Sequence, residues 1–181
     1  MFSIEIKRLW WIRDDGNDDP EDLCLHGEVI VRIGDESFGD GCCASASALY
    51  HLRTLTENHI ACYDEHPYTQ MLPCCGHCMF EATDGSVDIS GCPNGDDWTV
   101  HHMKAGVELT TKNGSITVVP FEEYRTNVLA FADQVMAYYF HCQPKSLPKE
   151  EFERNAYFAF WREWARRRGI AVEDTPFGRR T

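Results

Sequence analysis

The sequence has no apolar run that approaches the roughly 18 residues of a membrane-spanning helix, which excludes an integral membrane protein of the helical type. Its start, MFSIEIKRLWWIRDD, alternates charged and apolar residues and lacks the apolar segment of a secretory signal. No internal repeat or low-complexity segment is present, and the stretch GCPNGDDW, residues 91–98, has neither Walker nor dinucleotide-binding spacing. These absences predict a soluble cytoplasmic protein without a recognisable nucleotide site.

Positive charge is scarce over most of the chain. Residues 1–150 contain 10 Lys and Arg against 24 Asp and Glu, a net charge of -14, whereas residues 151–181 contain 7 against 5, a net charge of +2. An acidic body repels nucleic acid and anionic membranes, and its field speeds the encounter with a basic protein. The alternative explanation is that the negative charge serves only to keep the protein soluble.

The length and composition predict one globular domain. The chain has 181 residues, of which 43% are hydrophobic and 12% aromatic, enough for a single well-buried core. We expect one α+β domain over residues 1–169 and a C-terminal tail over residues 170–181.

Hydrophobic periodicity predicts the elements of this domain. Alternation of apolar and polar residues predicts two paired antiparallel strands at residues 2–12 and 26–34. Helical spacing predicts helices at residues 42–59, 121–142 and 149–168. In the last helix a mainly aromatic stripe is expected to be buried. It consists of Phe152, Ala156, Phe160 and Trp164 at steps of four residues, flanked by Tyr157 and Trp161.

Two turn signals predict a meander of about five short strands in the middle of the chain. Asp84-Gly85 and Asn113-Gly114 are preferred two-residue hairpin loops, because both central positions of a type I′ turn need positive φ. With these loops, Phe80, Ile116 and Val118 all face the core. The predicted fold is therefore α+β, with an antiparallel sheet made of the N-terminal strand pair and the meander, packed by one middle helix and two C-terminal helices.

The nine cysteines are an odd number in a chain expected to lie in a reducing compartment, so free thiols or a metal are favoured over a framework of disulfides. Residues 75–78 have the sequence CGHC, which matches a thiol-disulfide oxidoreductase letter for letter. Such a site needs a helix N-terminus or similar electropositive setting. Here the motif runs into a predicted hairpin with acidic neighbours, which argues against redox activity. Cys42 and Cys43, at the start of the middle helix, are expected to be small buried residues.

A structural zinc site is a second hypothesis for the cysteines. Cys75 and Cys78 form a CxxC pair, Cys92 supplies a third ligand, and His101 or His77 supplies a fourth. The alternative is a cluster of partly buried thiols without metal. A Cys/His enzyme, with Cys92 as nucleophile and His101 as base, is a third hypothesis, but no orienting residue or family signature accompanies it.

The segment DDGNDDPED, residues 14–22, is an acidic loop. It does not fit a calcium loop of EF-hand type, because a loop starting at Asp15 places Pro20 where glycine is required. A solvated turn and an acidic contact surface are the two interpretations. In the second, the partner-binding residues are Asp14, Asp15, Asp18, Asp19, Glu21 and Asp22, together with Asp96 and Asp97, which are expected to be exposed.

Four segments, PCCGH, GCPNGDDWTVHH, VPFEEYRTNVLAFADQVMAYY and FAFWREWARRR, resemble a group of short acidic bacterial proteins of the kind associated with immunity in polymorphic toxin systems. The resemblance spans about residues 72–168 and carries no catalytic residue. It implies a non-enzymatic protein that binds and masks a basic toxin domain, an expectation that agrees with the acidic surface.

Overall fold

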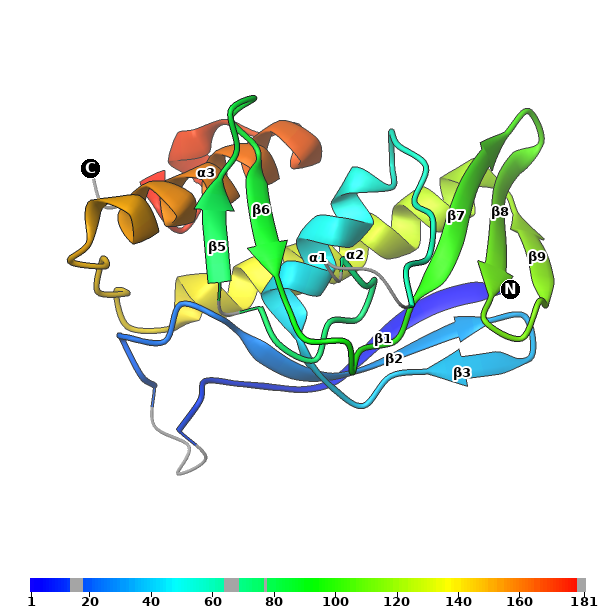
Figure 1. The fold of residues 1–181 in the computed structure, drawn as a ribbon, viewed down its shortest axis with the longest axis horizontal. Helices are drawn as coiled ribbons and strands as arrows, with labels where there is room; N and C mark the ends of the chain where they lie inside the picture. Colours follow the sequence, from blue (N-terminus) through cyan, green and yellow to red (C-terminus); the bar gives the residue numbers. More distant parts are fainter. Residues whose placement is uncertain (14–17, 64–68, 77, 179–181) are drawn as a thin grey trace.

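The computed structural model describes residues 1–13, 18–63, 69–76 and 78–178 (Figure 1). It confirms the predicted α+β class, with antiparallel sheets packed by three α-helices among the described residues. In chain order the elements are β1 Phe2–Trp10, β2 His26–Ile33, β3 Glu36–Phe38, β4 Gly41–Cys43, α1 Ala44–Arg53, β5 Cys78–Glu81, β6 Val87–Ser90, β7 Trp98–Met103, β8 Gly106–Thr111, β9 Ile116–Val119, α2 Phe121–His141, α3 Glu151–Arg168 and the short 3-10 helix η1 Val172–Asp174.

The N-terminal strands pair as expected from their alternation. β1 and β2 are antiparallel, with an irregularity between Ile6 and Arg8, and β3 and β4 add to the other edge of β2. On β2 the buried residues Val29, Val31 and Ile33 alternate with more exposed ones. Since successive side chains of a strand point to opposite faces, this sheet presents one apolar face to the core.

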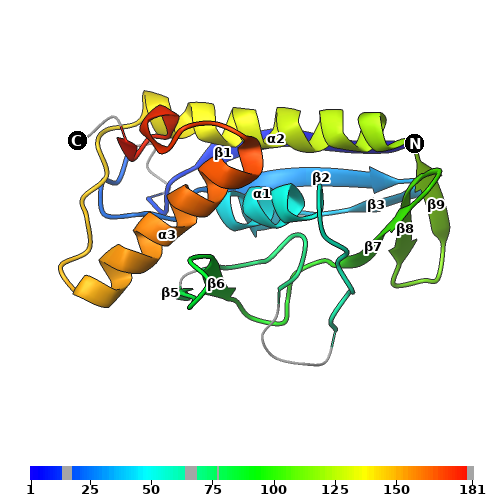
Figure 2. The ribbon, with the colours of Figure 1, turned by 90° about the horizontal axis from the view of Figure 1, so that it is seen from above.

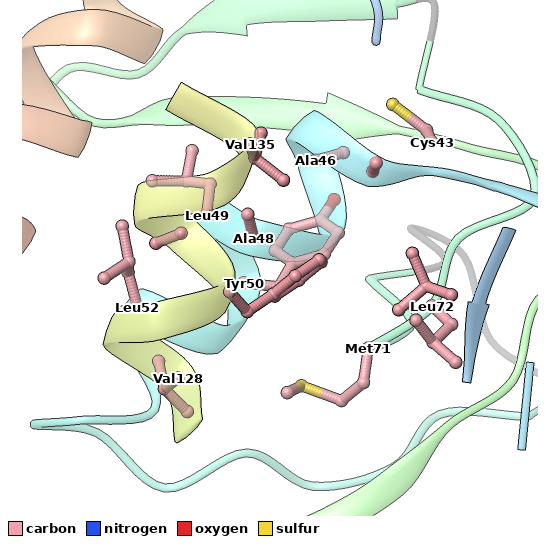
Figure 3. Packing of buried hydrophobic residues seen from close by; sticks show 14 of the residues in the cluster. Cys43, Ala46, Ala48, Leu49, Tyr50, Leu52, Met71, Leu72, Val128 and Val135 are labelled. Carbon is pink, nitrogen blue, oxygen red and sulfur yellow. The ribbon is translucent and has the colours of Figure 1, made fainter. Parts of the chain in front are cut away.

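The centre of the core is α1, which is buried from Ala44 to Leu52. Its small residues let it lie close to α2, and Figure 3 shows Leu52 of α1 toward Val128 of α2 and Leu49 toward Val135. Seen from above, α2 runs along β1 (Figure 2). The segment before β5 also packs on α1, where the Ser47 hydroxyl donates a hydrogen bond of 2.7 Å to the Met71 carbonyl.

The aromatic stripe of α3 is buried, as predicted, with one exception. Tyr157, Phe160, Trp161 and Trp164 belong to the core, whereas the side chain of Phe152, in the first turn, is 57% exposed. No helix among the described residues has the length and apolar character needed to cross a bilayer.

The predicted tail packs on α3 over its described part. Thr175 is fully buried, and the ring centroid of Phe177 lies 4.5 Å from that of Phe158. The described part of the predicted tail therefore packs on α3, although Glu173 and Asp174 are exposed.

The five central strands form as predicted but are divided between two sheets. Among the described residues β5 pairs with β6 alone, and β7, β8 and β9 form a separate three-stranded sheet. Figure 1 shows these two sheets on either side of α1. The β5–β6 hairpin packs on α3, whereas β8 of the three-stranded sheet contacts α2.

The register predicted for the β5–β6 hairpin is wrong by one residue. The Ala82 N–H donates to the Ser86 carbonyl, so three residues, 83–85, form the loop. Gly85 has a φ of 80°, but no described residue other than glycine has a positive φ, and the predicted type I′ turn would need one at Asp84 as well. As a result Phe80 pairs with Asp88 and its side chain is 50% exposed.

The β8–β9 hairpin differs from the prediction in the same way. Residues 112–114 form a three-residue loop, with Gly114 at a φ of 81°. A shift of one residue turns every side chain of a strand to the opposite face. Ile116 and Val118 are therefore 63% and 50% exposed, while Val119 is buried.

A matched pair of neighbouring substitutions tests this register. Val119→Ala should lower the free energy of unfolding by about 2 kcal/mol, because it removes buried methyl groups and leaves a cavity. Val118→Ala, at an exposed position, should change it by no more than about 0.5 kcal/mol. Urea denaturation of both variants gives the two values, and the reverse order would support the two-residue loop.

Candidate binding groove and cysteine cluster

The eight carboxylates predicted to bind a partner lie in different environments. Asp14 and Asp15 fall outside the described residues. The other six range from exposed to buried: Glu21 and Asp96 are exposed, Asp18 and Asp22 are partly buried, and Asp19 and Asp97 are buried.

Asp18 and Asp19 hold the acidic loop to the connection between α2 and α3. The buried ammonium group of Lys145 lies 3.0 Å from a carboxylate oxygen of Asp18 and donates to the Asp19 carbonyl at 2.7 Å. The same ammonium group stands 3.0 Å from the ring centroid of Trp11. The Asp19 carboxylate accepts a hydrogen bond from the Glu21 N–H at 3.0 Å and lies 3.2 Å from the Arg13 guanidinium. Both carboxylates therefore have partners within the fold, which explains part of the charge that the sequence assigns to a partner.

Asp22 organises the loop from within. One of its oxygens accepts a hydrogen bond from the Ile12 N–H at 2.6 Å, the other accepts from the Cys24 N–H at 3.0 Å, and His26 Nε2 lies 3.5 Å away. Burial raises the pKa of Asp22, but His26 and the two backbone N–H groups outweigh that effect, so the pKa lies below its usual value.

A groove of about 650 Å³ begins at the end of this loop. Its wall is completed by the start of β5, the α2–α3 connection and the first turn of α3, and the Ser146 N–H donates to the Pro20 carbonyl beside it. Figure 1 shows the α2–α3 connection next to the N-terminal loop. The charged residues lining the groove are Glu21, Asp22, Glu153 and Lys149, and the apolar ones include Leu23, Met79, Leu147 and Pro148.

Asp97 is not the exposed loop charge that the sequence predicts. The residue is 3% exposed, and its carboxylate accepts hydrogen bonds from three backbone N–H groups and one imidazole. Its neighbour Asp96 is exposed and accepts one hydrogen bond of 2.8 Å, from the Gly39 N–H. Two adjacent aspartates thus have different roles.

The predicted zinc ligands do not come together as a set. Cys78 is exposed on β5 opposite Ser90, and His101 is exposed on β7 opposite Glu108. The register expected from a two-residue loop would have placed Cys78 opposite Gly91, closer to Cys92. His77 lies outside the described residues.

A different group of sulfur atoms does assemble, and we call it the cysteine cluster: Cys74, Cys75 and Cys92. Their sulfur atoms lie within 4.8 Å of one another and could hold a metal ion. Cys74 and Cys92 are joined by a disulfide, and the Cys92 N–H donates to the Cys75 sulfur at 3.2 Å. Cys74 is the member of this cluster that the predicted ligand set did not include, although its place beside Cys75 in PCC was a visible signal.

A second pair of thiols is buried beside the groove. Cys43, at the start of α1, is hydrogen-bonded to Cys24, and this bond lowers the pKa of Cys43. Burial acts in the opposite direction, and hydrogen bonds from Ser45 and the Ala46 N–H lower the pKa further. Burial raises the pKa of Cys42. A side chain at Gly76 would place its Cβ 2.9 Å from the Cys43 sulfur, so the glycine of CGHC is explained by close packing.

No family model matches this chain, and no curated protein or solved structure matches it either.

Proposed function

We propose that this protein is a non-enzymatic cytoplasmic interaction protein, an immunity-type inhibitor that binds a basic segment of a toxin domain in the groove next to the acidic loop. The observation that carries the proposal is the composition of that groove. The groove is lined by two exposed carboxylates, Glu21 and Glu153, by one ammonium group, Lys149, and by several apolar side chains. The carboxylate of Asp22 also lines it but is hydrogen-bonded within the loop.

Such a lining suits lysine and arginine side chains of a partner. These side chains combine an aliphatic stem with a charged end, so the stem contacts apolar groups while the charge meets carboxylates. Leu147 in the groove wall and Phe152 in the first turn of α3 are both exposed apolar side chains that a partner would cover. The net charge of -12 adds long-range attraction toward a cationic surface.

Reversing charge in the groove tests the proposal. Glu21→Lys combined with Glu153→Lys should weaken binding roughly 100-fold, because like charges placed together across an interface cost several kcal/mol. The partner to use is the product of a neighbouring reading frame that encodes a basic C-terminal toxin domain, and binding is measured by titration calorimetry and by growth rescue on co-expression.

A control with the same change of charge is Glu173→Lys combined with Asp174→Lys, since both residues are exposed in η1. It should retain binding apart from a loss of long-range attraction that added salt also produces. Equal losses in the two double variants would contradict the groove as the binding site. Failure of the wild-type protein to bind or rescue would contradict the immunity function itself.

A second candidate function, a zinc-binding module, is favoured by the cysteine cluster. Thiolates are preferred zinc ligands, and three protein ligands leave a fourth position for water. Elemental analysis of protein purified under reducing conditions, without exposure to metal resin, should find about one zinc per chain. Protein free of metal that also fails to take up added zinc would exclude this candidate.

A further inference from the structure

The sulfur atoms of Cys74 and Cys92 can form either a disulfide or bonds to a metal ion. A disulfide joins Cys74 to Cys92, while the Cys75 thiol lies close to both sulfur atoms. A sulfur atom in a disulfide cannot act as a thiolate ligand, and a metal ligand must be deprotonated thiolate. A disulfide and a three-thiolate metal site are therefore mutually exclusive states of these three residues.

We propose that the cysteine cluster is a redox-gated zinc site. In its oxidised state the Cys74–Cys92 disulfide excludes metal, and after reduction by a dithiol the thiolates of Cys74, Cys75 and Cys92 bind one zinc ion. The inference rests on the zinc-binding candidate described above and adds to it the ligand set and the control by reduction.

The reaction balances without any further reagent. One thiolate of the dithiol attacks a sulfur of the Cys74–Cys92 bond, and the second thiol closes the reductant into a disulfide, so two electrons and two protons pass to the protein thiols. Zinc then binds three thiolates and releases three protons, with water in the fourth position. In reverse, the disulfide form of the reductant takes two electrons from Cys74 and Cys92, whose disulfide forms again. Zinc is released, one proton returns to Cys75, and two protons go to the re-formed dithiol.

The surroundings keep the three sulfur atoms close after the disulfide is broken. Leu72 and Asp96 form a backbone bridge with hydrogen bonds of 2.9 and 3.0 Å, which pairs the two chain segments just outside the cluster. Gln70, which is buried, donates to the carbonyls of Pro93 and Gly95 and accepts from the Gly95 N–H. These non-covalent links cross between the same segments that the disulfide joins.

The segment bearing Cys74 and Cys75 is also fixed from the other side. The Cys43 N–H donates to the Pro73 carbonyl at 2.8 Å, and Gly76 packs against the Cys43 sulfur. The Cys92 N–H already points at the Cys75 sulfur. Reduction thus leaves a set of thiols held in place, a condition for tight binding of metal to a small site.

Cobalt(II) is a suitable probe, because thiolate ligation to it gives charge-transfer absorption in the near ultraviolet. Wild-type protein is titrated anaerobically, once after reduction with a dithiol followed by its removal and once in the disulfide form, with zinc added last. We expect the reduced protein to bind one cobalt ion that zinc displaces, and the disulfide form to bind none.

Two serine variants identify the ligands. Cys75→Ser keeps the disulfide partners and should weaken metal binding by the reduced protein roughly 100-fold. Cys78→Ser removes the other half of the CxxC pair, which is exposed and outside the cluster, and should leave binding unchanged. Alkylation and mass spectrometry before each titration verify which cysteines are paired.

Three results would overturn the proposal. Equal metal binding by the reduced and disulfide forms would refute the gating while leaving the zinc-binding candidate in place. A loss of binding in Cys78→Ser as large as that in Cys75→Ser would refute the ligand set. No binding by the reduced, folded protein would refute both the inference and the zinc-binding candidate.

Discussion

Asp97→Asn is expected to lower the free energy of unfolding by about 3 kcal/mol, because it removes a buried charge that several donors surround. One carboxylate oxygen accepts from the N–H groups of Met71 and Trp98, at 3.1 and 3.0 Å, and from His59 Nε2 at 2.8 Å. The other accepts from the Cys62 N–H at 2.9 Å. An asparagine must turn its amide NH₂ group toward one of these donors, which leaves that donor without an acceptor.

The neighbouring Asp96 provides a control with the same chemistry. Asp96→Asn removes a charge from an exposed side chain whose hydrogen bond from the Gly39 N–H can be accepted equally by the amide oxygen. Its unfolding midpoint in urea should match that of the wild-type protein within about 0.5 kcal/mol. Comparable losses of stability in the two variants would show that these hydrogen bonds to Asp97 do not stabilise the fold.

Glu163→Gln should lower the free energy of unfolding by a similar amount, because Glu163 joins three elements. Its carboxylate accepts two hydrogen bonds of 2.8 Å from Arg53 of α1 and one of 2.9 Å from the Val87 N–H of β6. Removing one partner of a buried ion pair leaves the other charge uncompensated, and the expected loss is about 3 kcal/mol. Glu151→Gln, at an exposed position of the same helix, is the matched control and should leave the melting temperature unchanged.

The same pair predicts a pH dependence of stability. Burial raises the pKa of Glu163, but the hydrogen bonds and charge of Arg53 outweigh it, so the folded-state pKa lies below the usual value of 4.5. A lowered pKa means that the stabilisation is complete above the unfolded-state value and is lost as pH falls through the folded-state value. The difference in stability between wild type and Glu163→Gln should therefore shrink as the pH is lowered from about 5 to about 3. A constant difference over that interval would contradict this assignment.

Elements that can be recognised from the spacing of apolar residues within one segment were predicted well from the sequence. The β1–β2 pair, both long helices and the buried face of α3 follow from apolar spacing alone, since burial on one face imposes that spacing. The start of α1 at Ala44 also lies close to the expected residue 42, but its last turn ends at Arg53 and not near residue 59.

The hairpin registers could not be predicted, because the turn residues are ambiguous. A glycine with positive φ is required both in a two-residue type I′ loop and at the last position of a three-residue loop. The dipeptides at 84–85 and 113–114 satisfy either arrangement. The difference lies in the φ of Asp84 and Asn113, which depends on how the whole hairpin packs.

The cysteine cluster and the role of Asp97 depend on contacts between distant segments. The zinc hypothesis chose Cys78 because it forms a CxxC pair with Cys75, whereas the sulfur atoms that lie together are those of Cys74, Cys75 and Cys92. Asp97 is fixed by donors from residues 59, 62 and 71, and nothing within GCPNGDDW distinguishes it from Asp96. The groove was missed for the same reason, because Glu153 reaches it from a helix more than a hundred residues after the acidic loop.

The composition of the groove wall has a consequence for how the protein is made. Its residues come from positions 21–24, 76–79 and 146–153. A ribosome that adds about 5–20 residues per second therefore needs roughly ten seconds between the first wall segment and the last. During that interval a nascent chain has the acidic loop but no groove. If the groove is the inhibitory surface, protection begins only when synthesis has passed α3, so newly made chains offer no partial activity against a toxin.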